Sequence, residues 1–149
     1  MIARNNSDRE VTTTIRDHDE ETEILREFRT TYVDVLDPEM SHEEWNRASK
    51  KRRLVWRCPR QVSLDTAADL YGELSVYNGF HPSMVKELHK AFAGKGITVT
   101  PAREYSVAIL LHVPNCRSLR ERVMVFVRDN LNPDEVSWEE DGTLRLWWD

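Results

Sequence analysis

The chain has 149 residues and a formal net charge of -5 at pH 7, and 40% of its residues are hydrophobic while 32% are charged. This length fits one domain that buries about two thirds of its unfolded surface, and the hydrophobic content is too high for a wholly disordered chain. The longest apolar run, residues 107–111, is far shorter than the roughly twenty residues of a membrane-spanning helix, and the polar N-terminus lacks a secretory signal. We therefore expect a cytoplasmic protein, or one assembled into a particle made in the cytoplasm, with both cysteines reduced.

The first 18 residues are polar, but they contain an alternation of β-branched side chains. Val11, Thr13 and Ile15 alternate with other threonines, and this pattern favours an extended strand. Polar termini usually fray unless something holds them, so we expect the edge of a neighbouring sheet or a partner to hold this segment. Pairing within its own chain is the alternative. We expect residues 1–18 to form an extended arm and residues 19–149 to form a single α+β domain.

Two helices are predicted next. From Asp19 to Leu36 apolar residues recur at helical spacing, and three acidic residues at the start favour the positive end of the helix dipole. Asp37-Pro38 ends this helix. Ser41 followed by Glu44 three residues later is a capping box, which predicts that a second helix begins there.

The most distinctive segment of the chain, residues 45–60 (WNRASKKRRLVWRCPR), holds seven of the 21 basic residues and no carboxylate. We call it the basic stretch. Its cations and its two tryptophans are the candidate binding residues Trp45, Arg47, Lys50, Lys51, Arg52, Arg53, Trp56, Arg57 and Arg60. Positive charge beside flat apolar surface suits a phosphate backbone or an acidic protein face. The alternative is a solvated helix face without a partner.

We expect the second helix to run through the basic stretch to Cys58-Pro59, with a short strand at Arg53–Cys58 as the competing prediction. Ser63 is placed to cap a third helix through Leu74. A fourth helix is predicted from Pro82 to Gly94. The outer face of the fourth helix presents Lys86, His89 and Lys90.

The rest of the chain is rich in strand signals. Residues 97–100 and 105–113 form two β-rich runs separated by Pro101-Ala102-Arg103-Glu104, and we read them as a hairpin. A helix is expected at residues 117–131, although its valines also suit a strand. Residues 136–139 and 143–148 predict a second hairpin with an Asp-Gly turn. Alternation along its last strand turns Trp147 away from the core, so we expect this indole to be exposed or at an interface.

Two architectures fit this order of elements. The first is an α+β fold with an N-terminal helical unit followed by a ferredoxin-like sandwich. The alternative is a winged helix-turn-helix with a C-terminal β-hairpin, in which residues 97–113 form the wing. We favour the first architecture, because residues 105–113 (YSVAILLHV) are too apolar for a solvent-facing wing and resemble a central strand.

Signals for catalysis or metal binding are weak. The chain has no GxSxG, no GxxxxGK[ST] and no HExxH motif. His112 and Cys116 are the one close pair of metal-ligand types, and Cys58, His81 or His89 would have to complete a zinc site from elsewhere. Buried cysteines and scattered histidines are more often structural. We therefore expect no catalytic residue, no metal and no other cofactor.

These observations favour a non-enzymatic interaction or assembly protein. We expect it to be an oligomer or a subunit of a larger complex, such as a viral or phage-like structural assembly, that docks through the N-terminal arm, the basic stretch and Trp147. Its partner would be an acidic protein surface or nucleic acid, and no membrane is involved. The alternative is a winged-helix DNA-binding regulator in which Lys86 and Lys90 of the fourth helix contact DNA.

Overall fold

The computed structural model describes residues 14–36, 39–49, 54–139 and 141–149. The helices are α1 (Thr14–Thr31), α2 (Val33–Leu36), α3 (His42–Ser49), α4 (Leu64–Gly72), α5 (Met84–Phe92), α6 (Arg117–Phe126) and the π-helical turn η2 (Val127–Leu131). The strands are β1 (Val55–Arg57), β2 (Val62–Ser63), β3 (Thr98–Glu104), β4 (Ser106–His112), β5 (Glu135–Trp138) and β6 (Thr143–Trp148).

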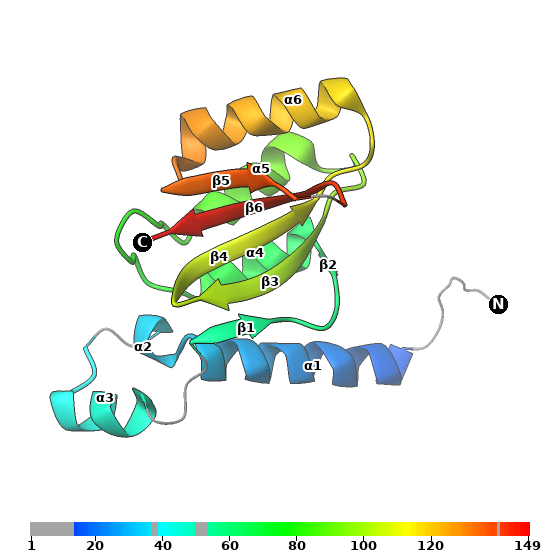
Figure 1. The fold of residues 1–149 in the computed structure, drawn as a ribbon. Coiled ribbons are helices and arrows are strands. Elements are labelled where there is room, and N and C mark those ends of the chain that lie inside the picture. Colours follow the sequence, from blue (N-terminus) through cyan, green and yellow to red (C-terminus); the bar gives the residue numbers. More distant parts are fainter. Residues whose placement is uncertain (1–13, 37–38, 50–53, 140) are drawn as a thin grey trace.

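The strands form one six-stranded sheet in the order β1-β3-β4-β6-β5, with β2 also pairing with β3 (Figure 1). Each of these pairs is antiparallel. The predicted α+β class is confirmed, but the ferredoxin-like arrangement is not. In that arrangement a helix connects two parallel strands separated by a third, whereas α4 and α5 here connect β1 and β2 to their direct antiparallel neighbour β3.

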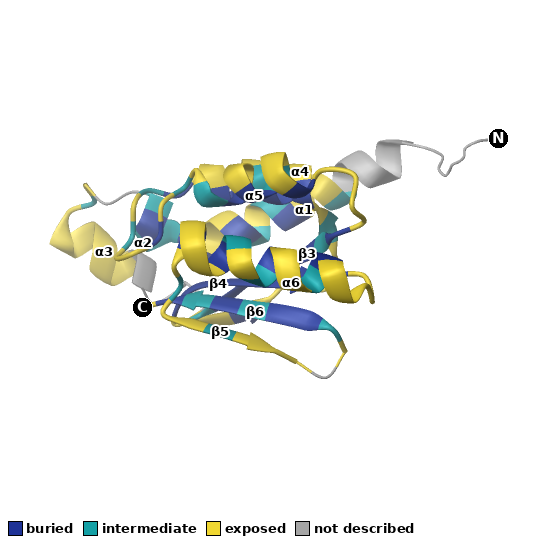
Figure 2. Ribbon diagram, turned by 90° about the horizontal axis from the view of Figure 1, so that it is seen from above, coloured by how far each residue is buried: buried dark blue, intermediate teal, exposed yellow. Residues whose placement is uncertain are grey.

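Helices cover one face of the sheet. Alternate residues of the central strands, including Ile109 and Leu146, point into a single core with buried residues of α1, α4, α5 and α6. Seen from above, α4, α5 and α6 lie on the same side of the strands (Figure 2). Both strands of the β3–β4 hairpin are buried at the centre of the sheet, so this hairpin does not form the solvent-facing wing of the alternative architecture.

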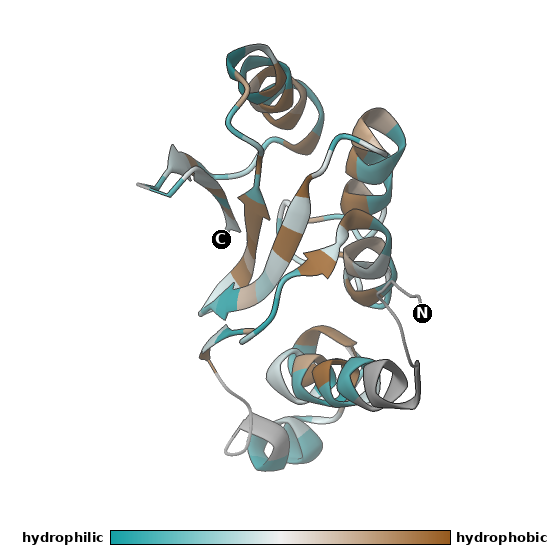
Figure 3. Cartoon of the chain, turned by 90° about the vertical axis from the view of Figure 1, so that its right-hand side faces the viewer, coloured by the Kyte–Doolittle hydropathy of each residue, from teal (hydrophilic) through white to brown (hydrophobic). Residues whose placement is uncertain are grey.

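The opposite face of the sheet carries a separate small cluster. Ala102, Ala108 and Leu110 are buried there, with Trp147 packed against them. In the described part of the chain no helix lies over this face, as the side view shows (Figure 3). We call it the open face.

Local signals explain most of the element boundaries. Ser41 and Glu44 form the predicted capping box, in which Ser41 Oγ accepts from the Glu44 amide at 3.1 Å and Glu44 Oε1 accepts from the Ser41 amide at 3.3 Å. Ser63 Oγ accepts from the Thr66 amide at 3.1 Å and caps α4 as expected. The helix at residues 117–131 and the C-terminal hairpin also form where predicted.

Several boundaries differ from the prediction, and the helix predicted from Asp19 to Leu36 is divided into α1 and α2. The second helix ends at Ser49, and Val55–Arg57 is a strand, so the competing prediction of a strand in this part of the basic stretch is the correct one. The reason is tertiary, because this segment pairs with β3. Residues 14–18, which we assigned to an extended arm, begin helix α1. The rest of the predicted arm lies outside the described residues.

Two tyrosine hydroxyls connect the helices to the middle of the sheet. Tyr32 Oη donates to the Ala102 carbonyl and accepts from the Ala108 amide. Tyr71 Oη donates to the Ala108 carbonyl at 2.7 Å and accepts from the Ala102 amide at 3.1 Å. Each hydroxyl therefore contacts both β3 and β4, and satisfying these buried groups orients the helical layer on the sheet.

Candidate functional site

The structure separates the predicted binding residues into several places. On α3, Trp45 and Arg47 are exposed, and Arg47 Nη1 lies 3.9 Å from a carboxylate oxygen of Glu43. Arg60 makes an ion pair of 3.2 Å with Glu20 of α1. Lys50, Lys51, Arg52 and Arg53 lie outside the described residues.

Trp56 corrects one of these predictions. It is buried on β1, where its indole Nε1 donates to Glu27 at 3.1 Å and its ring packs edge-on against Phe28. Alternation along β1 turns Trp56 toward the core and leaves Val55 and Arg57 exposed on the open face. Trp56 is therefore a core residue and is only 7% exposed.

Lys86 and Lys90 are exposed on α5, and Lys90 lies 3.6 Å from Glu87. This helix belongs to the layer on the covered side of the sheet (Figure 2), whereas Arg57 lines the sheet surface on the open face. The structure therefore does not bring these two lysines together with Arg57.

A cavity of about 370 Å³ lies on the open face at the end of the sheet near the β3–β4 turn. We call it the sheet-face groove. It is lined by Val55, Trp56, Arg57, Arg103, Glu104, Tyr105, Glu135, Arg145 and Trp147. Two of the predicted binding residues that remain on the surface, Arg57 and Trp147, therefore line the groove. The lining also includes aromatic and charged residues that were not predicted to bind a partner.

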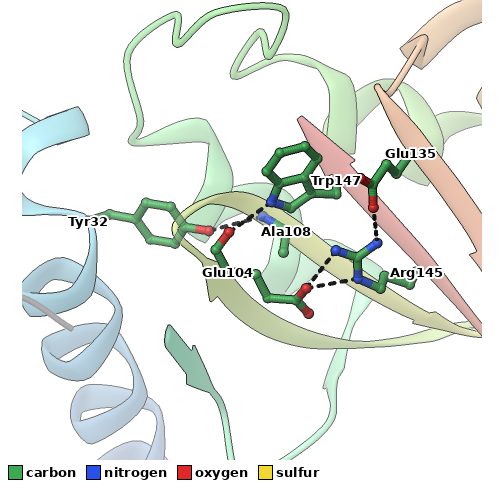
Figure 4. A network of polar contacts seen from close by, with 6 residues as sticks. All are labelled: Tyr32, Glu104, Ala108, Glu135, Arg145 and Trp147. Atoms are coloured by element: carbon green, nitrogen blue, oxygen red, sulfur yellow. Dashed lines mark hydrogen bonds and ion pairs between the residues drawn. The ribbon is translucent and has the colours of Figure 1, made fainter. Parts of the chain in front are cut away.

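Trp147 lies in the groove in a fixed orientation. Its indole Nε1 donates to the Glu104 carbonyl at 2.8 Å (Figure 4). The ring packs on the small buried residues Ala102 and Ala108. Because the indole N–H is already bonded, the part of Trp147 left for a partner is the face of its ring.

Arg145 binds both carboxylates of the groove. Its Nη2 and Nε contact Glu104 Oε1 at 2.6 and 2.9 Å, and its Nη1 contacts Glu135 Oε1 at 2.9 Å (Figure 4). The hydrogen bond to Glu104 raises the pKa of Arg145. The guanidinium offsets one of the two negative charges and holds both carboxylates against the sheet.

Tyr105 forms the turn between β3 and β4 and has a left-handed backbone with φ of 64°. Its amide donates to the Leu54 carbonyl at 2.6 Å, which ties the turn to the residue before β1. A left-handed backbone is unfavourable for a bulky residue without local hydrogen-bonding capacity. Nevertheless, the side chain is 67% exposed and stands beside Val55, which is 60% exposed.

The other end of the open face carries His112. Its Nε2 lies 2.6 Å from Thr100 Oγ1 and its Nδ1 lies 3.1 Å from Thr143 Oγ1. Burial lowers the pKa of His112. Both ring nitrogens therefore have hydrogen-bond partners when the imidazole is neutral. These contacts give His112 a structural role.

The possible zinc ligands are placed differently from one another. Cys58 is buried, whereas Cys116 is exposed beside Ser118, whose hydroxyl lowers the pKa of the Cys116 thiol. Among residues 14–36, 39–49, 54–139 and 141–149, no group of three or more His, Cys, Asp or Glu side chains could hold a metal ion.

A larger cavity of about 650 Å³ lies between α1, β2 and the start of α4. Glu20 and Arg60 on its rim are paired with each other. The hydroxyl of Ser63 is engaged in capping α4. This cavity therefore presents no activated nucleophile, and it contains none of the aromatic surface seen in the sheet-face groove.

Comparison with known proteins does not assign the chain to a family. The chain matches no protein family, no curated protein and no solved structure in three separate comparisons. Within the described ranges, no helix combines the length and apolar character needed to cross a lipid bilayer.

Proposed function

We propose that this chain is a non-enzymatic interaction protein that binds an anionic partner through the sheet-face groove and the basic stretch, whose residue Arg57 lines the groove. The observation that carries the proposal is Tyr105, a bulky aromatic residue held at φ of 64° with 67% of its surface exposed. Such a backbone costs about 1–3 kcal/mol and is typical of binding and switch regions. A ring this exposed contributes little to folding, so its presence at a strained position favours a role in contact.

Charge supports an anionic partner. Lys50–Arg53 immediately precede Leu54 in the chain, and the carbonyl of Leu54 accepts from the Tyr105 amide. Arg57 follows on the groove itself. The protein as a whole has a net charge of -5, so this cluster of cations differs in sign from the molecule and would attract acidic groups locally.

The contacts inside the groove favour binding over catalysis. Glu104 and Glu135 are ion-paired with Arg145, and Trp147 donates its only polar hydrogen to a backbone carbonyl. A general base or a metal ligand needs a carboxylate that is available to the substrate or ion. Both carboxylates of the groove are instead engaged by the guanidinium of Arg145.

Retention on a heparin column at neutral pH and low salt tests this function. We expect the wild-type protein to bind despite its negative net charge. A variant with Lys50, Lys51, Arg52, Arg53 and Arg57 replaced by alanine should flow through. The control replaces five exposed cations elsewhere, Lys86, Lys90, Arg117, Arg122 and Arg128, which gives the same net charge, and it should still bind.

Two results would contradict the proposal. One is a wild-type protein that does not bind heparin at all. The other is equal loss of binding in the two variants, which would mean that net charge and not the position of the cations controls retention.

A further inference from the structure

Trp147 of the sheet-face groove packs on small residues of the sheet. Ala102 and Ala108 are paired across β3 and β4, and both are fully or almost fully buried beneath Trp147. Small side chains at these positions let the indole lie on the sheet, and the hydrogen bond to Glu104 fixes the ring there. The groove therefore presents an immobilised aromatic face, which lowers the entropy lost when a planar group stacks on it.

A second aromatic ring stands at the rim. Tyr105 lines the same cavity as Trp147 and is mostly exposed. Aromatic rings on an uncovered sheet are a common means of stacking the bases of single strands. The cavity of about 370 Å³ is large enough to accept a small planar group.

The charges of the groove permit the approach of phosphates. Glu104 and Glu135 would repel an anion, but Arg145 lies between them at 2.6 and 2.9 Å. Arg57 adds a cation on the groove itself, and the run Lys50–Arg53 precedes it in the sequence. The partner must therefore offer planar groups that stack on the rings and negative charges that pair with the cations.

Resting on the function proposed above, we infer that the groove binds single-stranded nucleic acid. Its bases stack on Trp147 and Tyr105, and its phosphates contact Arg57. An acidic polypeptide would use the cations but has no regular planar groups for the rings. A duplex would offer phosphates, but its bases are already stacked inside the helix and cannot reach the sheet.

Fluorescence anisotropy with the full chain tests this inference. The probes are labelled oligo(dT), oligo(rU), a blunt duplex and an abasic deoxyribose-phosphate oligomer, all of one length. We expect at least one of the two single strands to bind at least about fivefold more tightly than the duplex and the abasic oligomer, because stacking is worth a factor of this size or more per base. Comparison of the two single strands shows whether DNA or RNA is preferred.

The main variant is Tyr105→Gly, which removes the ring and also relieves the left-handed backbone, so it keeps the fold. It should weaken single-strand binding by about five- to a hundredfold. Tyr105→Phe keeps the ring and should bind as the wild type does. The matched control is Trp138→Leu, which removes an exposed indole packed beside Arg120 on the covered side of the sheet, and its binding should be unchanged.

The outcomes separate this inference from the proposed function. Equal binding of abasic and base-containing strands, or unchanged binding by Tyr105→Gly, overturns the single-strand inference but keeps an anion-binding surface. If the protein binds none of the oligonucleotides but is still retained on heparin, the single-strand inference is also overturned. That result points to an acidic protein as the partner. Loss of heparin retention as well overturns both.

Discussion

Arg103 Nη1 lies 2.7 Å from Asp34 Oδ1, in an ion pair that joins the middle of the sheet to helix α2. The second arm of the pair, Arg103 Nη2 to Asp34 Oδ2, measures 3.1 Å. Arg103 is only 1% exposed and also donates to the Thr31 carbonyl at 2.6 Å, while its guanidinium lies over the ring of Tyr32. A charge buried this deeply depends on its partner, because it cannot be hydrated instead.

The first prediction is that Asp34→Ala destabilises the protein by about 3–5 kcal/mol, because it leaves the buried guanidinium without a counter-charge. Urea denaturation followed by circular dichroism measures the change. The control is Glu73→Ala, which breaks the Arg29–Glu73 pair. That pair also has two contacts, at 2.8 and 3.0 Å, but it is largely exposed. The control should cost less than about 1 kcal/mol. If the two variants lost equal stability, burial would not make the protein more dependent on the Asp34 ion pair than on the exposed Glu73 pair.

Arg103 also shows where sequence analysis fails. Proline and two charged residues made Pro101-Ala102-Arg103-Glu104 look like a turn, yet all four continue β3, and the turn is reduced to Tyr105. The carboxylate that makes burial of Arg103 possible lies 69 residues earlier in the chain. No local pattern contains that information, because the partner is supplied by the tertiary fold.

Alternation was more informative for the C-terminal strand. It correctly turned Trp147 away from the core, which contains its neighbours Leu144, Leu146 and Trp148. The same rule applied to β1 would have buried Trp56, but we favoured a helix continued from the capping box at Ser41 and kept this strand as the competing prediction. A strand of three residues is too short for alternation to decide between the two. Tyr105 carried no sequence signal, since a left-handed turn usually shows Gly or Asn.

The second prediction concerns the strain at Tyr105. Tyr105→Gly should be about 1 kcal/mol more stable than Tyr105→Ala, because only glycine adopts φ of 64° without steric cost. Both variants lose the ring, so their difference isolates the backbone. Thermal unfolding measures it as a difference in Tm of roughly 3 °C. Equal Tm values would show that the turn holds no strain, and the main support for the proposed function would be lost.

The third prediction is a pH dependence that arises from His112. Burial lowers its pKa below the value of about 6.5 that it has in the unfolded chain. Between these two values the unfolded chain binds more protons, so stability rises with pH there. The contribution is fully present above about pH 6.5 and is lost as the pH falls through the folded-state pKa.

We therefore expect the wild type to lose stability between about pH 7 and pH 5, where the reference carboxyl groups are still mainly ionised. His112→Gln should make this decline shallower. His42→Gln serves as the control, because His42 is exposed on α3. Urea titrations at a series of pH values provide the measurement. A decline of the same steepness in His112→Gln would assign the pH dependence to other groups.

The fourth prediction concerns the turn between β5 and β6. Gly142 has φ of 81°, and a Cβ added there would meet the guanidinium of Arg120. That guanidinium cannot move without cost, because it donates to the Val113 and Pro114 carbonyls at 3.0 and 3.2 Å and lies over the ring of Trp138. Gly142→Ala should therefore destabilise the protein by about 1–3 kcal/mol through backbone strain and the loss of these contacts.

Gly72, the last residue of α4, is the matched control for Gly142. A Cβ added at Gly72 has open space around it, and its backbone is not left-handed. Alanine there should be neutral or stabilise the protein by up to about 1 kcal/mol, because it has the higher helix propensity and reduces the freedom of the unfolded chain. Both variants replace glycine by alanine, at different positions. Opposite shifts of their urea midpoints at constant m-value would therefore assign the destabilisation of Gly142→Ala to the turn. Shifts of the same sign and size would show that Arg120 gives way and that the turn tolerates a side chain.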